Sequence, residues 1–361
     1  MTGISQYLLI GSLESYSGKS ATLLGMGAQL KERGFDIAYG KPLSTGNENL
    51  MFKGMDKDGA FIAQILDLPA DRLYPTLVSM DRQTIQRRLS QGNAGNGQAK
   101  FQPHYPPSPE QLVLLEGPGT LDEGRLFGLS LAQMADQLSA GIVLVIPFDG
   151  QKVIDQALSA QERLGDRLLG IVVNDITADF IEPFDQEFAP YLESQGIAIL
   201  GQLPRSNLLR SISVRELVSR LEATVLCRSD RLDLMVESLR IGAMNVNSAL
   251  KYFRKAENMA VVTGGDRTDI QLAALETSTQ CLILTGHLSP SELIISRAEE
   301  LEIPILTVDL DTLTTVEIID NAFGTVPIQE PVKVKCMSEL TAAHVDLDRL
   351  LGYLKDRGMG G

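Results

Sequence analysis

The sequence predicts an α/β fold in two domains: a mostly parallel sheet covered by helices on both faces, followed by a second, smaller α/β domain. The chain has 361 residues, which is long for one ordinary core, and 44% of them are hydrophobic, as is typical of globular proteins. Short apolar runs alternate with segments of helical pattern, which is the arrangement of a parallel sheet with helices on both faces. This alternation pauses at residues 222–230 and then resumes, which predicts a domain boundary there.

The predicted strands divide between the two domains. Those of the first domain are Tyr7–Ile10, Asp36–Tyr39, Leu112–Leu115, Ile142–Ile146, Leu169–Val173 and Ile197–Leu200. Those of the second are Met259–Val262, Cys281–Leu284 and Ile305–Val308, with helical stretches at Gln271–Leu275 and Leu293–Leu301. We expect the domains to span residues 1–222, ending after a polar helix at Val214–Leu221, and 223–345, with a C-terminal tail at 346–361. The segment Ser90–Pro109 is rich in Gly, Asn and Pro, which predicts a mobile surface loop.

Composition restricts the expected location and partners. The net charge is −14, with an excess of acidic residues in both halves of the chain. Such a chain repels polyanions, so neither nucleic acid nor an anionic membrane is an expected partner. No apolar run approaches the roughly 18 residues of a membrane helix, and the N-terminus lacks the pattern of a signal peptide. A cytoplasmic location is therefore expected.

The cysteines and histidines do not suggest a catalytic or metal-binding set. The three cysteines, Cys227, Cys281 and Cys336, are far apart and lack metal-ligand spacing, so we expect reduced thiols. The three histidines are His104 in the predicted mobile loop, His287 beside a glycine and His344 near the tail.

The strongest chemical signal is the segment YLLIGSLESYSGKSATLLGMGAQLKERG at residues 7–34. It reads as a buried strand, a small polar loop and a helix. The N–H groups at a helix start have no partners within the helix, so a loop that leads into one can bind phosphate. Lys19 would add positive charge near the terminal phosphates, Ser20 would place a hydroxyl on Mg²⁺, and Gly18 would allow close approach of the backbone.

The loop departs from the standard P-loop pattern in one place. A GxxxxGK[ST] loop carries glycine where this chain has Leu13, while Gly11 lies two residues earlier. The alternative interpretation is a helix start that only happens to contain Gly-Lys-Ser. Its position directly after the first predicted strand favours phosphate binding.

Two later strands end in polar residues at the same predicted edge of the sheet. The motif GKPLSTG places Lys41, Ser44 and Thr45 after the second strand, and LLEGPG places Glu116 at the end of the next. Ligands of open parallel sheets bind at this edge. We therefore expect Lys41 to bind phosphate or an acidic substrate, and Glu116 to bind Mg²⁺, which prefers oxygen ligands. The alternative for Lys41 is a surface lysine before a proline-induced turn.

Two further acids, Asp56 and Asp58 in GMDKDGA, precede a predicted helix near Gly59. They can supply a second carboxylate to the metal, or they can be solvated N-caps of that helix. Glu116 is the stronger metal candidate because it ends a buried strand at the ligand-binding edge.

Five motifs in this order, SLESYSGKS, GKPLSTG, DKDGAF, LLEGPG and GIVVND, resemble the dethiobiotin synthetase-like domain, which also precedes certain phosphotransacetylases. The resemblance covers about residues 4–222 and implies a P-loop NTPase-like domain that binds ATP and Mg²⁺. The nucleotide contacts that it implies are Ser17, Gly18, Lys19, Ser20, Ala21, Thr45 and Asn174. The metal ligands that it implies are Ser20, Asp58 and Glu116. If the protein is an enzyme, Lys19 and Lys41 are the expected catalytic residues.

The chain also departs from that family near the phosphate loop. Glu14 and Tyr16 stand where dethiobiotin synthetases favour Asp and Gly, and Pro118 interrupts a run that usually contains small residues. A bulky Tyr16 over the phosphate path would slow or abolish turnover.

The segment MAVVTGGDRTDIQLAAL resembles the DRTGG domain, which lies between the dethiobiotin synthetase-like and catalytic domains of long phosphotransacetylases. The likeness covers roughly residues 230–340. At its strand-to-helix junction, Gly264, Gly265, Arg267 and Thr268 are a candidate site for an anionic small-molecule effector. The alternative is a tight turn in which the arginine pairs with an acid across a subunit interface. Either Thr268 or the nearby Asp266 is expected to cap the helix.

These features lead to three functional hypotheses. Both domains resemble the regulatory part of larger enzymes, and acetyl transfer in long phosphotransacetylases belongs to a further C-terminal domain, so that activity is not expected. The first hypothesis is a regulatory or adaptor protein that binds ATP and Mg²⁺, forms a homo-oligomer and senses a small-molecule effector. The second is an ATP-dependent ligase or cyclase acting on a small carboxylate or carbamate. The third is a degenerate P-loop scaffold.

Overall fold

The structure is a computed structural model that describes residues 6–45, 57–90, 101, 111–286, 288–326 and 328–358. It consists of two compact units, each of which is described by itself. The first unit comprises Met1–Arg205 together with Pro327–Gly361, and the second comprises Ser206–Val326. This division differs from the boundaries expected at residues 222 and 345. The first unit ends earlier in the chain, and it includes the C-terminal segment.

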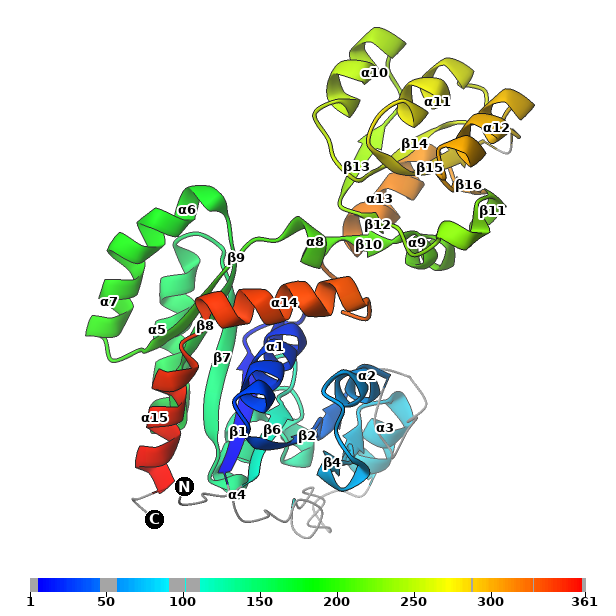
Figure 1. Cartoon of the computed structure of the whole chain (residues 1–361). Helices are drawn as coiled ribbons and strands as arrows, with labels where there is room; N and C mark the ends of the chain where they lie inside the picture. The colour runs from blue at the N-terminus through cyan, green and yellow to red at the C-terminus, as the bar shows by residue number, and fades with distance from the viewer. Residues whose placement is uncertain are drawn as a thin grey trace. The chain divides into compact units, whose positions relative to one another are not determined.

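The first unit contains a parallel sheet of seven strands in the order β4-β2-β6-β1-β7-β8-β9 (Figure 1). The strands are β1 Gln6–Ser12, β2 Asp36–Gly40, β4 Leu73–Tyr74, β6 Gln111–Glu116, β7 Gly141–Pro147, β8 Leu168–Ile176 and β9 Ile199–Pro204. A separate parallel pair joins β3 (Leu43–Ser44) to β5 (Val78–Ser79). The α/β class and the parallel sheet predicted from the apolar runs are thus confirmed. Strand β9 lies further along the chain than expected.

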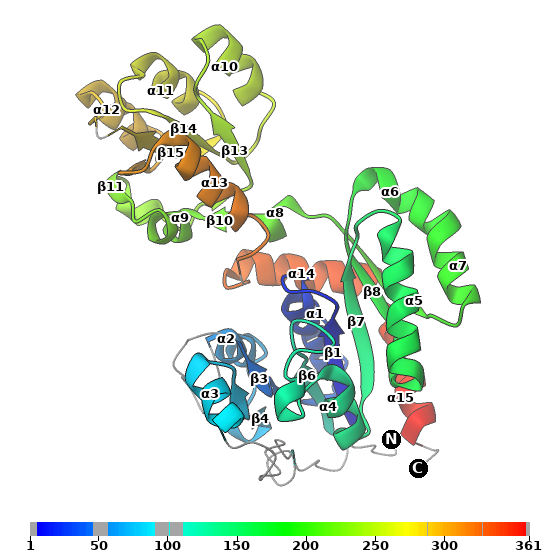
Figure 2. The same cartoon turned by 180° about the vertical axis from the view of Figure 1, so that it is seen from behind.

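Helices cover both faces of this sheet, as predicted. They are α1 Lys19–Glu32, α2 Lys57–Ile65, α3 Arg82–Ser90, α4 Leu131–Leu138, α5 Lys152–Leu164, α6 Ala178–Pro183, α7 Ala189–Ser194, α14 Pro331–His344 and α15 Leu347–Gly358. Side chains of a strand alternate between the two faces. Leu9, Val113 and Leu115 pack with residues of α4 and α5. Their neighbours along the strands therefore face α1, which lies on the opposite side with α14 (Figures 1 and 2).

The C-terminal segment joins the first unit for a topological reason. The connection from β1 through α1 to β2 runs in one direction along the sheet, and that from β7 through α5 to β8 runs in the other. Parallel connections are right-handed, so these two place their helices on opposite faces. The α1 side of β8 and β9 would remain bare, and α14 and α15 pack there.

Specific contacts hold these C-terminal helices in place. Val345 forms an antiparallel bridge with Gly201 of β9. The Arg349 guanidinium of α15 pairs with both oxygens of Glu193 at 2.6 and 2.8 Å, and these hydrogen bonds lower the pKa of that carboxyl. Residues expected to form part of the second domain and a tail therefore complete the core of the first unit.

The predicted mobile loop Ser90–Pro109 lies mostly outside the described residues, as do Asp56, His104 and His287. Two of its residues are described. Ser90 ends α3. Phe101 is only 2% exposed and packs in the core of the first unit. Phe101 is therefore a core residue and not part of a surface loop, because burial of its aromatic ring removes a large apolar area from water.

The second unit is the smaller α/β domain expected from the sequence. Its sheet has the order β11-β16-β15-β14-β13, parallel except for β11. The strands are β11 Thr224–Cys227, β13 Ser238–Ile241, β14 Met259–Gly264, β15 Thr279–Thr285 and β16 Ile305–Thr307. The sequence did not indicate β11 or β13, because both are edge strands whose side chains are mostly half-buried or exposed.

The helices of the second unit again lie on both faces. They are α8 Asn207–Arg210, α9 Val214–Arg220, α10 Val246–Phe253, α11 Thr268–Leu275, α12 Glu292–Glu300 and α13 Thr312–Ala322. A short antiparallel pair joins β10 (Ile212–Ser213) to β12 (Met235–Val236). The cores on the two sides of the sheet are formed with α10 to α12 and with α9 and α13, respectively. In the parts of the chain that the structure describes, no helix has both the length and the apolar character needed to cross a membrane.

The cysteines are free thiols, as the sequence predicted. Cys227 and Cys281 are buried in the second unit, and burial raises the pKa of both thiols. Such thiols remain protonated at neutral pH and are poor nucleophiles.

Candidate functional site

The loop between β1 and α1 contains a position that requires glycine. Gly18 has a φ of +88°, and a Cβ atom there would lie 2.2 Å from Nδ2 of Asn174. Asn174 belongs to β8 and donates a hydrogen bond from this amide nitrogen to the Ser17 carbonyl at 2.9 Å. The amide thereby braces the loop just before the first turn of α1. In the described loop, no side chain caps that first turn, so its N–H groups are available to an anion.

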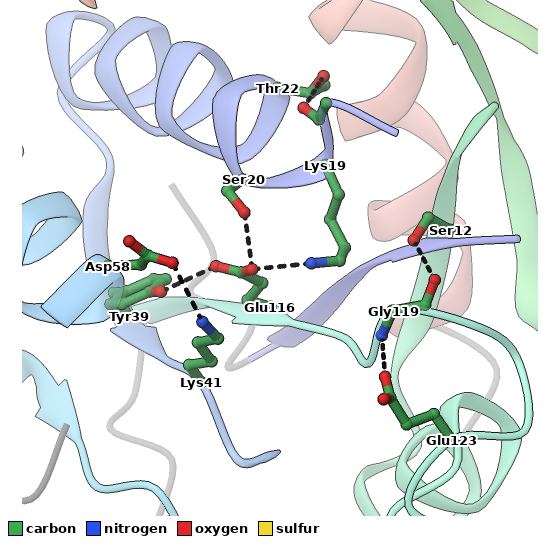
Figure 3. A network of polar contacts seen from close by, with 11 residues as sticks. Ser12, Lys19, Ser20, Thr22, Tyr39, Lys41, Asp58, Glu116, Gly119 and Glu123 are labelled. Atoms are coloured by element: carbon green, nitrogen blue, oxygen red, sulfur yellow. Dashed lines mark hydrogen bonds and ion pairs between the residues drawn. The ribbon is translucent and has the colours of Figure 1, made fainter. Parts of the chain in front are cut away.

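Glu116 lies at the centre of a network of polar contacts at the carboxyl ends of β2 and β6 (Figure 3). Its side chain is 1% exposed. One carboxylate oxygen, Oε1, accepts hydrogen bonds from Lys19 Nζ and Ser20 Oγ, each at 2.8 Å. The other, Oε2, accepts one from Tyr39 Oη at 3.1 Å. Because strand side chains alternate, Glu116 and Tyr39 both lie on the α1 side of the sheet, opposite Leu115.

The charge state of Glu116 follows from these neighbours. Burial by itself would raise the pKa of Glu116, because an ionised carboxylate loses its hydration. The positive charges of Lys19 and Lys41 and the hydrogen bonds from Lys19 and Ser20 outweigh burial and hold the pKa at about 2. Glu116 is therefore ionised at neutral pH and is a buried negative charge that requires a cation.

Lys41 and Asp58 lie beside this network. Lys41 follows β2, and its ammonium group is 3.9 Å from the carboxylate of Asp58 in the first turn of α2. Figure 3 shows both side chains next to Glu116. The structure thus brings together Lys19, Ser20, Lys41, Asp58 and Glu116, which the sequence predicted as phosphate, substrate and metal contacts.

Two other residues of the GKPLSTG motif are placed differently. Ser44 is 1% exposed, and its hydroxyl has no hydrogen-bond partner among the described residues. Thr45, predicted to contact the nucleotide, is exposed at the end of a described segment. No contact of Thr45 with the Glu116 network is seen in the described part of the chain.

Sequence reasoning missed Tyr39 and Ser12. The Ser12 hydroxyl donates to the Gly119 carbonyl at 3.0 Å, which ties the loop after β6 to the end of β1 (Figure 3). Tyr39 lies two residues before Lys41, and the alternation of strand side chains was the signal that would place both on one face. Its apolar surroundings in the sequence suggested only a core residue.

The loop residues that depart from the family pattern are accommodated. Tyr16 has a left-handed φ of +60°, which costs a non-glycine residue roughly 1–2 kcal/mol. Its side chain is 74% exposed, so the ring lies largely in solvent. Leu13 packs in part against the core of the first unit.

In the second unit, other protein groups lie against the residues of the candidate effector site. A Cβ atom at Gly264 would lie 2.5 Å from Oδ1 of Asp266, and one at Gly265 would lie 2.1 Å from the Leu288 carbonyl. The backbone of Leu288 therefore requires a glycine at position 265, whereas at Gly264 the Asp266 side chain alone would have to move. Arg267 donates to the Met244 carbonyl at 2.9 Å, so its guanidinium already has a partner.

The expected cap of helix α11 is also absent. Arg267 occupies the N-cap position, Thr268 is the first helical residue, and neither Thr268 nor Asp266 provides a side-chain cap. Arg267 pairs with Asp269, its neighbour in the first turn, at 3.3 Å. The prediction of a capping Thr268 or Asp266 is therefore wrong, because the turn directs Asp266 over Gly264.

Family comparisons agree with this geometry. A family model described as "AAA domain" matches residues 6–213, and one described as "DRTGG domain" matches residues 216–322. The chain belongs to the AAA domain family. The predicted order of a P-loop domain followed by a DRTGG domain is thereby confirmed.

Relatives with curated descriptions share both domains. The chain is 24% identical over 379 residues to a phosphate acetyltransferase of Synechocystis sp., covering 96% of this chain and 52% of that protein. It is 26% identical over 381 residues to one from Nitratidesulfovibrio vulgaris, covering 98% of this chain and 52% of that protein. The chain thus spans about half the length of these curated relatives.

Two solved structures share weaker similarity. One contains the CBS and DRTGG domains of the regulatory region of Clostridium perfringens pyrophosphatase, complexed with its activator diadenosine tetraphosphate. It matches at a TM-score of 0.29 and 20% identity, over 43% of this chain and 74% of that one. The MinD cell division protein of Aquifex aeolicus matches at a TM-score of 0.32 and 14% identity. That match covers 56% of this chain and 83% of the MinD chain.

Proposed function

We propose that the first unit binds ATP with Mg²⁺ and that the protein acts as a regulatory or adaptor protein in the cytoplasm. The observation that carries this proposal is the convergence of Lys19, Ser20 and Glu116 at the start of α1. The left-handed Gly18 leads into the same helix start. A lysine, a hydroxyl and a carboxylate at such a loop are the groups that bind phosphates and a hard cation.

The described residues fit Mg²⁺ in particular. No group of three or more His, Cys, Asp or Glu side chains in the described part of the chain is placed to hold a metal. Ser20 and the buried Glu116 carboxylate offer oxygen ligands 2.8 Å apart. Mg²⁺ is commonly held by one or two protein oxygens with phosphates and waters completing its shell. Mg²⁺ would supply positive charge to the phosphate oxygens and to Glu116.

The same geometry makes nucleotide and metal binding interdependent. In the structure, Lys19 donates to Glu116, whereas its proposed role requires it to donate to phosphate. If Lys19 left, the buried carboxylate would lose its nearest cation, and an unpaired buried charge is costly. Lys19 can therefore change partners readily only when another cation compensates Glu116.

A regulatory role is supported by the path of the chain. The second unit is inserted between β9 and α14, and both of these elements belong to the first unit. Helix α14 packs on α1, whose first turn carries Lys19 and Ser20. A ligand with different affinity for two arrangements of these helices would shift their populations. We propose that the second unit provides oligomerisation or binds a small-molecule effector.

Calorimetry with Lys19→Ala tests the proposal. We expect ATP·Mg²⁺ to bind the native protein and to bind the variant about 10–100-fold more weakly, because hydrogen bonds to charged groups contribute about 1.5–3 kcal/mol. Lys335→Ala is the control, since that side chain is 78% exposed on α14. Titrations with ATP and ADP, with and without Mg²⁺, measure the effect.

Equal heats from the native protein and the Lys19→Ala variant would exclude this site. The degenerate-scaffold hypothesis has its own outcome. Binding to the native state must raise its melting temperature by mass action. Failure of millimolar ATP·Mg²⁺ to do so would favour a scaffold that no longer binds nucleotide.

Ligation of a small acid is the second candidate function, and the position of Lys41 favours it. Its ammonium group lies near Asp58 and contributes to the low pKa of Glu116, so it lies beside the place proposed for the phosphates. A carboxylate or carbamate held there would be next to a phosphoryl donor. Small acids, diaminopelargonate included, should then stimulate ATP turnover. A panel that produces no stimulation would contradict this function.

A further inference from the structure

We propose that Tyr39 is a positioning residue that makes Glu116 present a single oxygen to the metal and thereby sets a preference for Mg²⁺ over Ca²⁺. This inference rests on the proposed binding of nucleotide with a divalent cation. It assigns a role to a residue outside the loop motifs.

The two oxygens of Glu116 have different partners. Oε1 accepts hydrogen bonds from Lys19 and Ser20 at the start of α1, each at 2.8 Å (Figure 3). Oε2 accepts a hydrogen bond from the Tyr39 hydroxyl at 3.1 Å. The tyrosine is held firmly. Its side chain is fully buried in β2, which pairs with β6 in parallel register, Tyr39 opposite Leu114.

This division of partners restrains how the carboxylate is oriented. An orientation of the carboxylate that turned both oxygens towards Ser20 at once would break the Tyr39 hydrogen bond. A buried hydroxyl that loses its partner costs roughly 1–3 kcal/mol. Oε1 is therefore the oxygen available on the α1 side, and Oε2 is retained on the β2 side.

The restraint matters differently for the two cations. Mg²⁺ requires near-ideal octahedral geometry at about 2.0–2.1 Å and usually keeps several waters, which suits one oxygen from a carboxylate. Ca²⁺ takes six to eight oxygens at about 2.3–2.6 Å and readily uses both oxygens of a carboxylate. A carboxylate with one oxygen held by Tyr39 therefore favours Mg²⁺.

Tyr39→Phe tests this role, with Tyr74→Phe as the matched control. Tyr74 is also a buried tyrosine of this sheet, and its hydroxyl donates to Gln111 Oε1 at 3.3 Å, at the start of β6 rather than at its end. Mg²⁺ and Ca²⁺ are titrated separately into the full chain with a non-hydrolysable ATP analogue, and the metal dissociation constants are measured. The affinity for the analogue is also measured in EDTA.

In Tyr39→Phe, we expect Mg²⁺ binding to weaken by about 10-fold or more, as loss of a group that orients a metal ligand typically does. Ca²⁺ binding should change much less, so the ratio of the two affinities falls. Binding of the analogue in EDTA should be unchanged. Tyr74→Phe should retain all native values.

An unchanged Mg²⁺-to-Ca²⁺ ratio in a folded Tyr39→Phe variant would overturn the inference. An equal loss of affinity for Mg²⁺, for Ca²⁺ and for the analogue in EDTA would also overturn the inference, because it would indicate a merely structural role. If the native protein binds the analogue with neither cation, the proposed function itself fails.

Glu116→Asp is the second variant, because its shorter side chain withdraws the carboxylate from Tyr39. It should lower the same ratio, and a native ratio would contradict the role of Tyr39.

Discussion

Gly18→Ala is expected to abolish tight binding of ATP·Mg²⁺ and to lower the free energy of unfolding of the first unit by about 2–4 kcal/mol. Its φ of +88° is a conformation that costs an L-residue roughly 1–2 kcal/mol. The new methyl group would lie 2.2 Å from the Asn174 amide nitrogen and would displace it from the Ser17 carbonyl. Loss of that hydrogen bond adds about 1 kcal/mol, and the loop loses its support from β8.

Gly34→Ala is the matched control for this prediction. Gly34 has a φ of +84°, but a Cβ atom there meets nothing within 4 Å. The Gly34→Ala variant should therefore be destabilised only by the left-handed backbone conformation, by about 1–2 kcal/mol. Its binding of ATP should be unchanged. Urea denaturation and calorimetry measure the two effects. Equal destabilisation by both variants, with ATP binding retained in each, would show that Asn174 does not constrain the loop.

Gly25→Ala is expected to destabilise the first unit by about 1–3 kcal/mol, although alanine is the better helix former. Gly25 lies within α1, and a Cβ atom there would lie 2.1 Å from Oγ1 of Thr341 and 3.1 Å from the Met337 carbonyl. Helix α14 would have to move away from α1. The change would also weaken ATP binding if the α1–α14 packing holds the first turn of α1 in place.

Gly352→Ala is the control for the effect of helix propensity. Gly352 lies within α15, and a Cβ atom there meets nothing within 4 Å. This substitution should stabilise the protein by about 0.5–1 kcal/mol, because alanine loses less backbone entropy. Thermal and urea unfolding of both variants measure the difference. If Gly25→Ala stabilised the protein as Gly352→Ala does, close α1–α14 packing would be disproved.

The contact between α1 and α14 bears on the proposed regulatory role as well as on stability. Helix α14 is the first helix after the second unit in the chain, and α1 begins with Lys19 and Ser20. A change at the proposed nucleotide site that moved α1 would therefore act on α14, the helix that follows the second unit in the chain. The Gly25→Ala variant thus probes both the fold and the proposed coupling.

Much of the candidate site was predictable because local motifs followed recognisable strands. Lys19, Lys41 and Glu116 each follow or end an apolar run, and parallel strands bring their carboxyl ends to one edge. Tyr39 was not predictable as a site residue, because its proposed role depends on the orientation of a carboxylate on the neighbouring strand. The contact of the Asn174 amide with the loop at Gly18 was also not predictable, because the two residues are 156 positions apart in the chain.

The sequence by itself determined the α/β class, the parallel strands and the group of candidate phosphate and metal contacts around Lys19 and Glu116. These depend on short-range patterns, namely apolar runs, helix starts and strand ends. Only the tertiary structure decided that residues 331–358 return to the first unit and that the Leu288 backbone lies against Gly265 in the second. Right-handed connections leave one side of β8 and β9 bare, and only a distant segment of the chain can bury it.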